Sequence, residues 1–347
     1  MRGLWRTGRG RVRPLRWALA LLAAALALPA AAAPAGDAWT TAATLHRGIN
    51  VLGYDPLWTD PARARFQPRH FKVIRDGGFD FVRVVLFAFP HLDAGNRLDD
   101  RWLATLDGVV GGARAAGLSV ILDEHDFDVC SADPETCRPK LLAVWKQLAA
   151  RYRQEPASVL FEPLNEPHAR LDAVHWNALL VELIAAIRAT NPTRTLVIGP
   201  TGWNSLDQLS MLALPTDDRG ILVTVHDYEP FRFTHQGASW ADGGVKELHG
   251  IPFTDADAAR IGRDLDRVAD WSKANGRPVL LGEFGAYDRS GTPLADRVRY
   301  TATVRRAAEA RHLPWAYWQF DSDFVAYDMA RDAWVEPIRQ ALTGQVR

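Results

Sequence analysis

The stretch 160–168 reads Leu-Phe-Glu-Pro-Leu-Asn-Glu-Pro-His, and the stretch 280–285 reads Leu-Leu-Gly-Glu-Phe-Gly. Each is an apolar run that stops at a glutamate, Glu166 in the first and Glu283 in the second. If both runs are strands of one parallel sheet, the side chains at their carboxyl ends lie at the same rim. Two facing carboxylates are the minimum equipment for cleaving a glycosidic bond. This pair is the first candidate site.

The composition is that of a large globular chain. Its 347 residues are 48% hydrophobic and 24% charged, and the formal net charge is zero. A neutral chain lacks the positive charge that binds a polyanion, so we expect no nucleic-acid partner. The 13 tryptophans, 7 tyrosines and 14 phenylalanines are mainly core residues in our interpretation, although exposed rings can also serve as platforms for the apolar faces of sugars.

The amino-terminal segment has the pattern of an export signal. An apolar run over 17–28 is followed by Pro29 and by Ala-Pro-Ala at 33–35, which suits a signal peptidase. Six arginines precede the run: Arg2, Arg6, Arg9, Arg11, Arg13 and Arg16. The alternative is a retained tethering helix, but the run is shorter than the ~20 apolar residues that span a bilayer. We therefore predict a signal peptide over 1–35, a mature chain over 36–347, a secreted or periplasmic location and no membrane association after cleavage.

The chain contains two cysteines, Cys130 and Cys137. In an oxidising compartment, two thiols this close in sequence are expected to form a disulfide. Two free thiols are the alternative, because the distance between the Cα atoms cannot be read from sequence. Two cysteines alone make a poor structural zinc site.

From residue 47 onward, short apolar runs alternate with longer amphipathic segments, which is typical of a parallel sheet wrapped by helices. The helical patterns include 141–152, 173–190, 255–274 and 295–311. Eight candidate strands lie at 47–52, 79–86, 119–125, 158–164, 195–199, 221–228, 278–283 and 315–320. We predict an α/β fold, a (β/α)₈ TIM barrel that forms a single domain over 36–347. An open doubly wound sheet is the competing topology, but residues 50–55 lack the Gly-rich turn that it usually carries after the first strand.

Barrel enzymes place their chemistry at the carboxyl ends of the strands, so polar residues there are the candidates. Each one alone is ordinary, because a single His, Tyr or Arg at a strand end is more often structural. Together they are hard to explain as packing. The set comprises Arg83, His125, Asn165 with Glu166, His226 with Tyr228, Glu283 and Trp318.

These motifs resemble glycoside hydrolase family 5, the family of retaining barrel enzymes that contains cellulases. The similarity runs in order from about residue 47 to 335, and Asn-Glu-Pro followed at long range by Gly-Glu-Phe-Gly is its most specific part. The matching motifs are Arg-Gly-Ile-Asn at 47–50, Phe-Val-Arg-Val at 81–84, Asp-Glu-His at 123–125, Leu-Asn-Glu-Pro at 164–167, His-Asp-Tyr at 226–228, Gly-Glu-Phe-Gly at 282–285 and Trp-Ala-Tyr-Trp at 315–318.

The resemblance implies that Glu166 is the general acid and base and that Glu283 is the nucleophile. For retention of configuration the two carboxyl groups should lie ~5 to 5.5 Å apart, whereas an inverting enzyme needs ~6.5 to 9.5 Å. The resemblance further implies hydrogen bonds from Arg83 and Tyr228 to Glu283. The remaining implied roles are sugar 2-hydroxyl binding by Asn165, substrate binding or glutamate orientation by His125 and His226, and a subsite floor at Trp318.

Three tryptophans follow strands in loop-like contexts, Trp58, Trp203 and Trp240. For each, a sugar platform and loop packing are equally good interpretations. Metal and serine chemistry find no support, since neither His-Glu-x-x-His nor Gly-x-Ser-x-Gly occurs in the sequence. We therefore expect no metal and no cofactor.

The sequence thus predicts a monomeric, retaining, endo-acting enzyme that cleaves β-1,4-glucan of the cellulose type, with mixed-linkage β-glucan as an open addition. β-Mannanase, xyloglucanase and β-1,3-glucanase are alternatives on the same scaffold, and a transglycosylase shares the first chemical step. A non-catalytic sugar-binding barrel is disfavoured, because a binding module has no use for a paired acid and nucleophile.

Overall fold

Parallel strands form a closed barrel in which each strand pairs with the next and β8 pairs with β1. The computed structural model describes residues 36–241, 243–289 and 291–344. The predicted (β/α)₈ barrel is confirmed, and the open doubly wound sheet is wrong. The barrel strands all lie within the predicted ranges: β1 Arg47–Val51, β2 Phe81–Leu86, β3 Ser119–Glu124, β4 Val159–Glu162, β5 Leu196–Ile198, β6 Ile221–His226, β7 Val279–Glu283 and β8 Trp315–Tyr317.

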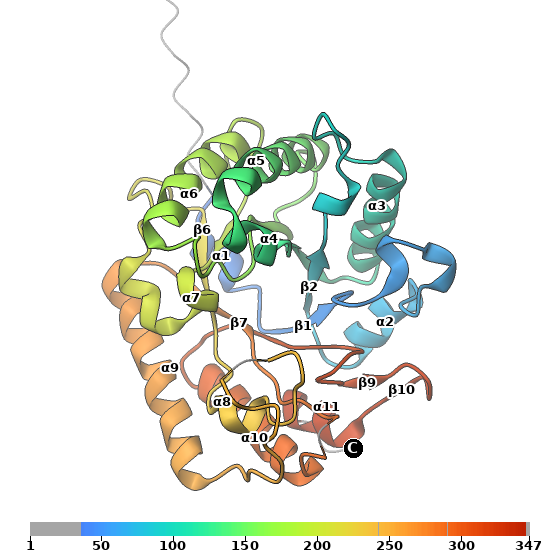
Figure 1. Ribbon diagram of the computed structural model, residues 1–347, viewed down its shortest axis with the longest axis vertical. Coiled ribbons are helices and arrows are strands. Elements are labelled where there is room, and N and C mark those ends of the chain that lie inside the picture. Colours follow the sequence, from blue (N-terminus) through green and yellow to red (C-terminus); the bar gives the residue numbers. More distant parts are fainter. Residues whose placement is uncertain (1–35, 242, 290, 345–347) are drawn as a thin grey trace, which may run out of the picture. The chain divides into compact units, whose positions relative to one another are not determined.

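Helices connect successive strands and surround the barrel (Figure 1). They are α1 Ala38–Ala42, α2 Arg69–Asp76, α3 Asp100–Ala115, α4 Phe127–Ala132, α5 Pro134–Arg151, α6 Ala173–Arg188, α7 Thr201–Asn204, α8 Phe231–Thr234, α9 Asp255–Asn275, α10 Leu294–Glu309 and α11 Glu336–Thr343. Short 3₁₀ turns lie at η1 Pro56–Trp58, η2 Pro61–Arg63, η3 Phe89–His91 and η4 Leu206–Met211, and a small hairpin pairs β9 Tyr327–Asp328 with β10 Ala333–Trp334. The four predicted helices correspond to α5, α6, α9 and α10.

Local sequence explains where these helices begin and end. Helix α9 starts at a capping box, in which Thr254 and Asp257 satisfy each other's backbone N–H groups, and it ends at Gly276 with φ 61°. Helix α5 starts earlier than predicted, because Asp133 accepts a hydrogen bond from the Thr136 N–H and Pro134 occupies the first turn.

The barrel interior is layered. Its amino-terminal half is apolar, and helix α1 packs against it with Ala38 and Ala42. The inward-facing strand residues of this layer are Phe81, Ile121, Leu160, Val197, Leu222, Leu280 and Ala316. Because side chains alternate along a strand, the residues two positions further on also face inward. On β2, β3 and β4 these are Arg83, Asp123 and Glu162, so the interior becomes charged toward the carboxyl ends, where the candidate site lies.

Cys130 and Cys137 form the predicted disulfide, which joins α4 to α5. The predicted signal peptide over 1–35 lies outside the described residues. No helix within the described ranges is long and apolar enough to cross a membrane.

We expect the double replacement Cys130→Ser with Cys137→Ser to destabilise the fold without abolishing it. The chain-entropy model credits closure of so short a loop with about 2.4 kcal/mol. Thermal unfolding should therefore occur several degrees lower in the variant than in the oxidised wild-type protein. Wild-type protein kept in a reductant is the matched control and should show the same shift. An unchanged unfolding temperature in both samples would contradict this account.

Candidate active site

Arg83 is the centre of the polar layer and is fully buried. Its Nε and Nη2 donate to the two oxygens of Glu162 at 2.7 and 2.9 Å. Its Nη1 donates to Glu283 Oε1 at 2.6 Å and to Asn50 Oδ1 at 2.9 Å. The second Nη2 hydrogen goes to Asn165 Oδ1 at 2.8 Å. All five N–H donors of the guanidinium therefore have partners, as a buried arginine requires.

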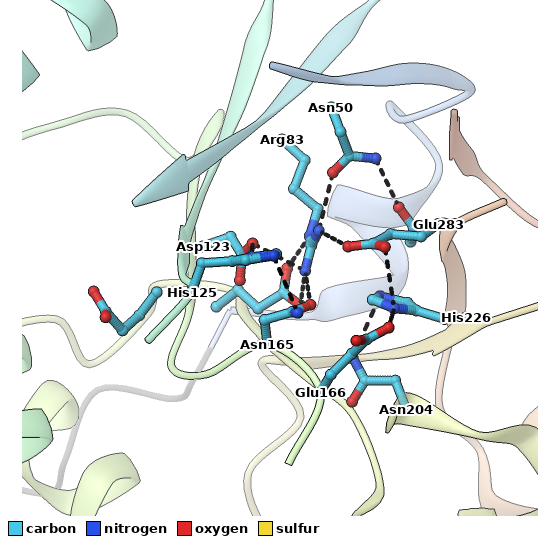
Figure 2. A network of polar contacts seen from close by, with 12 residues as sticks. Asn50, Arg83, Asp123, His125, Asn165, Glu166, Asn204, His226 and Glu283 are labelled. Carbon is cyan, nitrogen blue, oxygen red and sulfur yellow. Dashed lines mark hydrogen bonds and ion pairs between the residues drawn. The ribbon is translucent and has the colours of Figure 1, made fainter. Parts of the chain in front are cut away.

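A closed ring of one ion pair and three hydrogen bonds extends from this arginine (Figure 2). Asp123 Oδ2 lies 3.1 Å from Arg83 Nη2 and 2.7 Å from His125 Nδ1. Because Nδ1 faces a carboxylate, it carries the proton, which leaves His125 Nε2 as an acceptor. Asn165 Nδ2 then donates to this Nε2 at 3.3 Å, while its Oδ1 returns to Arg83. The ring fixes the orientation of the Asn165 amide and the tautomer of His125.

The two candidate glutamates meet across His226. Its Nδ1 lies 2.6 Å from Glu166 Oε1 and 3.5 Å from Glu283 Oε2. One carboxylate oxygen of each glutamate and this ring nitrogen all lie within 4.8 Å of one another. Figure 2 shows His226 between the two carboxyl groups. The sequence-predicted pair is therefore brought together in space from β4 and β7.

Local backbone features bring these groups into place. The register of β6 against β7 shifts between Val225 and His226, so that His226 pairs with Glu283. Such an irregularity re-aims the side chains that follow it. Glu166 has φ 40°, in the left-handed region that non-glycine residues seldom adopt. Glu166 lies in the irregular segment after β4, four residues beyond the last residue of that strand.

The environments of the two glutamates differ. Glu283 accepts from Arg83 and also from the Tyr228 hydroxyl at 2.8 Å, so both hydrogen bonds expected from the resemblance are present. Glu166 is bonded to His226, and its side chain is 14% exposed. Burial raises the pKa of Glu166 to about 7, although nearby His125 and Arg83 act in the opposite direction. Burial also raises the pKa of Glu283, against the lowering effects of His226 and Arg83.

Both histidines of the site are neutral. Burial lowers the pKa of His125 to about 4 and that of His226 to about 3. The Nε2 of His226 faces the amide nitrogen of Asn204 at 3.3 Å and therefore accepts from it. The proton of His226 then lies on Nδ1, from which it is donated to the Glu166 carboxylate.

Three of the tryptophans singled out in the sequence pack against histidine rings. Trp318 stacks on His125 with ring centroids 5.6 Å apart. Trp203 is 56% exposed and stacks on His168, whose Nδ1 is hydrogen-bonded to the Glu166 carbonyl oxygen. Trp240 is 54% exposed and touches the ring of His235 edge-on. More than half of the surface of Trp203 and of Trp240 is thus exposed and accessible to a sugar.

Trp58 differs from these residues. It is 6% exposed, its indole N–H donates to the Val85 carbonyl oxygen, and its ring packs on Trp102. Of the two interpretations that the sequence allows for Trp58, the structure favours packing over a sugar platform. Burial of this kind is set by tertiary contacts, which a loop-like sequence context does not reveal.

The sequence analysis missed several residues of the network, namely Asn50, Asp123, Glu162 and Asn204. Glu162 and Asp123 lie inside strands rather than after them, and the alternation of inward-facing positions was the signal that could have found them. Asn50 also lies in a strand, where its amide donates to the carbonyl oxygens of Gly282 and Tyr317.

A metal-ligand geometry occurs once among the described residues, formed by Glu166, His226 and Glu283. Its atoms already take part in hydrogen bonds: His226 with Glu166, and Arg83 and Tyr228 with Glu283. The arrangement can therefore hold a proton on one carboxyl group and a negative charge on the other.

Comparison with known proteins identifies the family. The family model for cellulase, glycosyl hydrolase family 5, matches residues 42–323. The chain belongs to glycosyl hydrolase family 5. It is thus an enzyme of the glycoside hydrolase class, and the family predicted from the sequence motifs is confirmed.

Among the relatives of this family 5 chain is Endoglucanase 3 of Fibrobacter succinogenes, which is 27% identical over 81% of the chain and 50% of that protein. Endoglucanase H of Acetivibrio thermocellus is 27% identical over 79% of the chain and 29% of that protein. The chain thus spans half or less of these curated relatives. The structure of Thermotoga maritima Cel5A with cellobiose is 35% identical, has a TM-score of 0.83, and covers 88% of the chain and 100% of its own. The same protein with mannotriose is 34% identical, with a TM-score of 0.83 and the same coverages.

Replacing Arg83 with methionine should destabilise the fold in a pH-dependent way. The change leaves Asp123, Glu162 and Glu283 buried without their shared cation, and breaking a buried pair in this way costs about 3–5 kcal/mol. Loss of the cation raises the folded-state pKa of these carboxyl groups further above their unfolded values. The stability associated with such groups is present below the unfolded pKa and is lost as pH rises.

Urea unfolding of wild type and Arg83→Met at pH 5 and pH 8 measures this effect. The difference in unfolding free energy between the two proteins should be larger at pH 8. An equal difference at both pH values would mean that lost packing, rather than unpaired charge, accounts for the change.

Proposed function

We propose that the protein is a secreted or periplasmic, retaining, endo-acting β-1,4-glucanase that uses Glu166 and Glu283 in a double displacement. The observation that carries this proposal is the approach of the two carboxylates. One oxygen of each lies within 4.8 Å of one oxygen of the other, an approach that supports the ~5 to 5.5 Å separation of the carboxyl groups in retaining enzymes over the ~6.5 to 9.5 Å that admits a water molecule.

The different environments of the two glutamates support the division of roles. Glu283 receives hydrogen bonds from the Arg83 cation and from Tyr228, and both interactions favour the carboxylate form that a nucleophile needs. Among the described residues no cation hydrogen-bonds to the Glu166 carboxyl group, and with its pKa near 7 this group keeps its proton through the mildly acidic range. Activity limited by this proton falls as pH rises through about 7, because the deprotonated group cannot act as an acid.

The proposed reaction proceeds in two steps. Glu283 attacks the anomeric carbon, the bond to the leaving oxygen breaks, and Glu166 gives its proton to that oxygen. The product of this step is a glycosyl ester on Glu283. Glu166, now a carboxylate, removes a proton from water, and the water oxygen displaces Glu283 at the same carbon. Two inversions give net retention.

The neighbouring residues are suited to holding a sugar. The Asn165 amide is fixed by Arg83 and His125, and one hydrogen of its NH₂ group remains for the sugar 2-hydroxyl. Trp318, held against His125, supplies a flat floor for the ring that reacts. Trp203 and Trp240 are proposed as platforms for neighbouring sugar units.

The names of the relatives support the proposed substrate class. Several curated relatives are named endoglucanases, and the similar Thermotoga structures contain cellobiose or mannotriose. We place β-1,4-glucan first, with mixed-linkage β-glucan as an addition, and β-1,4-mannan second. Export rests on the sequence pattern over 1–35, and we propose a monomer.

Glu283→Ala should abolish cleavage while leaving the fold intact, because the alanine removes the attacking oxygen. Added azide or formate can enter the vacated space and attack the sugar directly. Partial rescue with an inverted product is therefore expected, measured by NMR of the anomeric configuration on an aryl cellobioside. Full activity in Glu283→Gln would remove this residue from the nucleophile role.

A panel of polysaccharides tests the substrate. We expect the highest rates on carboxymethyl cellulose and barley β-glucan, a lower rate on mannan, and none in matched Glu166→Gln protein. Cleavage of laminarin or xyloglucan alone would contradict the proposed linkage. Product analysis with excess acceptor separates hydrolysis from transfer, since a transglycosylase would produce longer oligosaccharides.

A further inference from the structure

Glu162 is a buried carboxylate that the proposed reaction does not use. It is the last residue of β4, four positions before Glu166, and it is fully buried. Both of its oxygens accept hydrogen bonds from one edge of Arg83, from Nε at 2.7 Å and Nη2 at 2.9 Å. With no exposed surface, Glu162 cannot touch a sugar, so any effect on the reaction passes through Arg83.

The two parallel hydrogen bonds between Arg83 and Glu162, called the fork below, fix the direction of the Nη1 donors of Arg83. A guanidinium is planar and rigid, so holding its Nε and Nη2 edge sets where Nη1 points. That nitrogen donates to Glu283 at 2.6 Å and to Asn50 at 2.9 Å. Asn50 is itself held by the carbonyl oxygens of Gly282 and Tyr317, on strands β7 and β8. Glu162 and Asn50 thus hold Arg83 from two sides against the nucleophile.

Glu162 also determines how much positive charge Glu283 experiences. A single guanidinium faces three carboxyl groups, those of Asp123, Glu162 and Glu283. Burial raises the pKa of Glu162 to about 7, whereas its bidentate contact with Arg83 is the geometry that favours a charged pair. A negative charge in that position partly cancels the field of Arg83 at Glu283. A charged Glu162 therefore weakens the attraction between Arg83 and Glu283.

We propose that Glu162 is a positioning residue for the nucleophile. It orients the Arg83 guanidinium toward Glu283 and offsets part of the positive charge that Arg83 presents to Glu283. This inference rests on the proposed nucleophile role of Glu283. It differs from a purely structural role, in which Glu162 would only neutralise a buried cation, because it predicts an effect on the titration of Glu283.

The test uses 2,4-dinitrophenyl β-cellobioside, whose leaving group needs no protonation, so that kcat/KM reports attack by Glu283 without help from Glu166. Glu162→Gln removes the charge and places an amide N–H₂ against the arginine donors. We expect kcat/KM to fall about 100-fold, as for a catalytic group displaced by about 1 Å. The KM should stay within about threefold, since Glu162 does not touch substrate.

The pH profile distinguishes positioning from structure. Without the negative charge of Glu162, the positive charge of Arg83 acts more strongly on Glu283, which then ionises at lower pH. The acid limb of the profile, where kcat/KM falls because Glu283 becomes protonated, should therefore move down by about one pH unit. Glu162→Asp keeps the charge but shortens the fork, and should lower the rate while leaving the acid limb at its wild-type pH. Glu309→Gln, at a partly exposed ion pair with Arg47 at the amino-terminal end of β1, is the matched control and should behave as wild type.

Two outcomes would overturn the inference: a wild-type rate in Glu162→Gln, or equal losses in both Glu162 variants with no movement of the acid limb. Thermal unfolding confirms that each variant is folded, and the aspartate variant provides the test if the glutamine variant does not fold. Failure of the proposed function can be told apart from failure of this inference, because the wild-type enzyme would then cleave neither the aryl cellobioside nor the polysaccharides.

Discussion

One buried cation among carboxylates is the constraint on which the site depends. Arg83 is surrounded by the barrel wall, and each of its donors reaches an acceptor on another strand or on the turn that follows it. Its partners come from β1, β4, β7 and the turn after β4, so the ion pairs also join strands that are far apart in sequence. A barrel interior with this much charge is tolerable only when every group is paired. Pairing therefore serves the fold and the chemistry at once.

The layering of the barrel explains how such a site is supported. The apolar layer near the amino-terminal ends of the strands provides the hydrophobic burial, and α1 packs against it. The charged layer lies two residues further along the same strands, where side chains point inward again. Hydrophobic burial and the candidate chemistry are thus carried by different residues of the same strands. The alternation that builds a barrel also delivers the functional groups to one end of it.

The barrel fold and the two central glutamates could be predicted from the sequence. The eight strands were found because each is a short apolar run bounded by turn residues, and Glu166 and Glu283 were found because polar groups end such runs. Glu162 and Asp123 lie within strands and do not stand out as polar ends of apolar runs, so only the alternation of inward-facing positions along β3 and β4 indicates them. Trp58 could not be told from Trp203 for a related reason, since exposure depends on which loop covers which ring. The hydrogen-bond ring through His125 and Asn165 depends on distances that no local pattern encodes.

The short helix α4 links a covalent bond to the turn that carries Glu166. Cys130 ties this helix to α5, and the next residue, Ser131, uses its hydroxyl and its carbonyl oxygen to hold the backbone N–H groups of His168 and Arg170. His168 in turn is bonded to the carbonyl oxygen of Glu166. The disulfide thereby restricts the conformations open to the segment that carries Glu166. Reduction of this one bond would therefore loosen the backbone around Glu166, and not only the two helices that the bond joins.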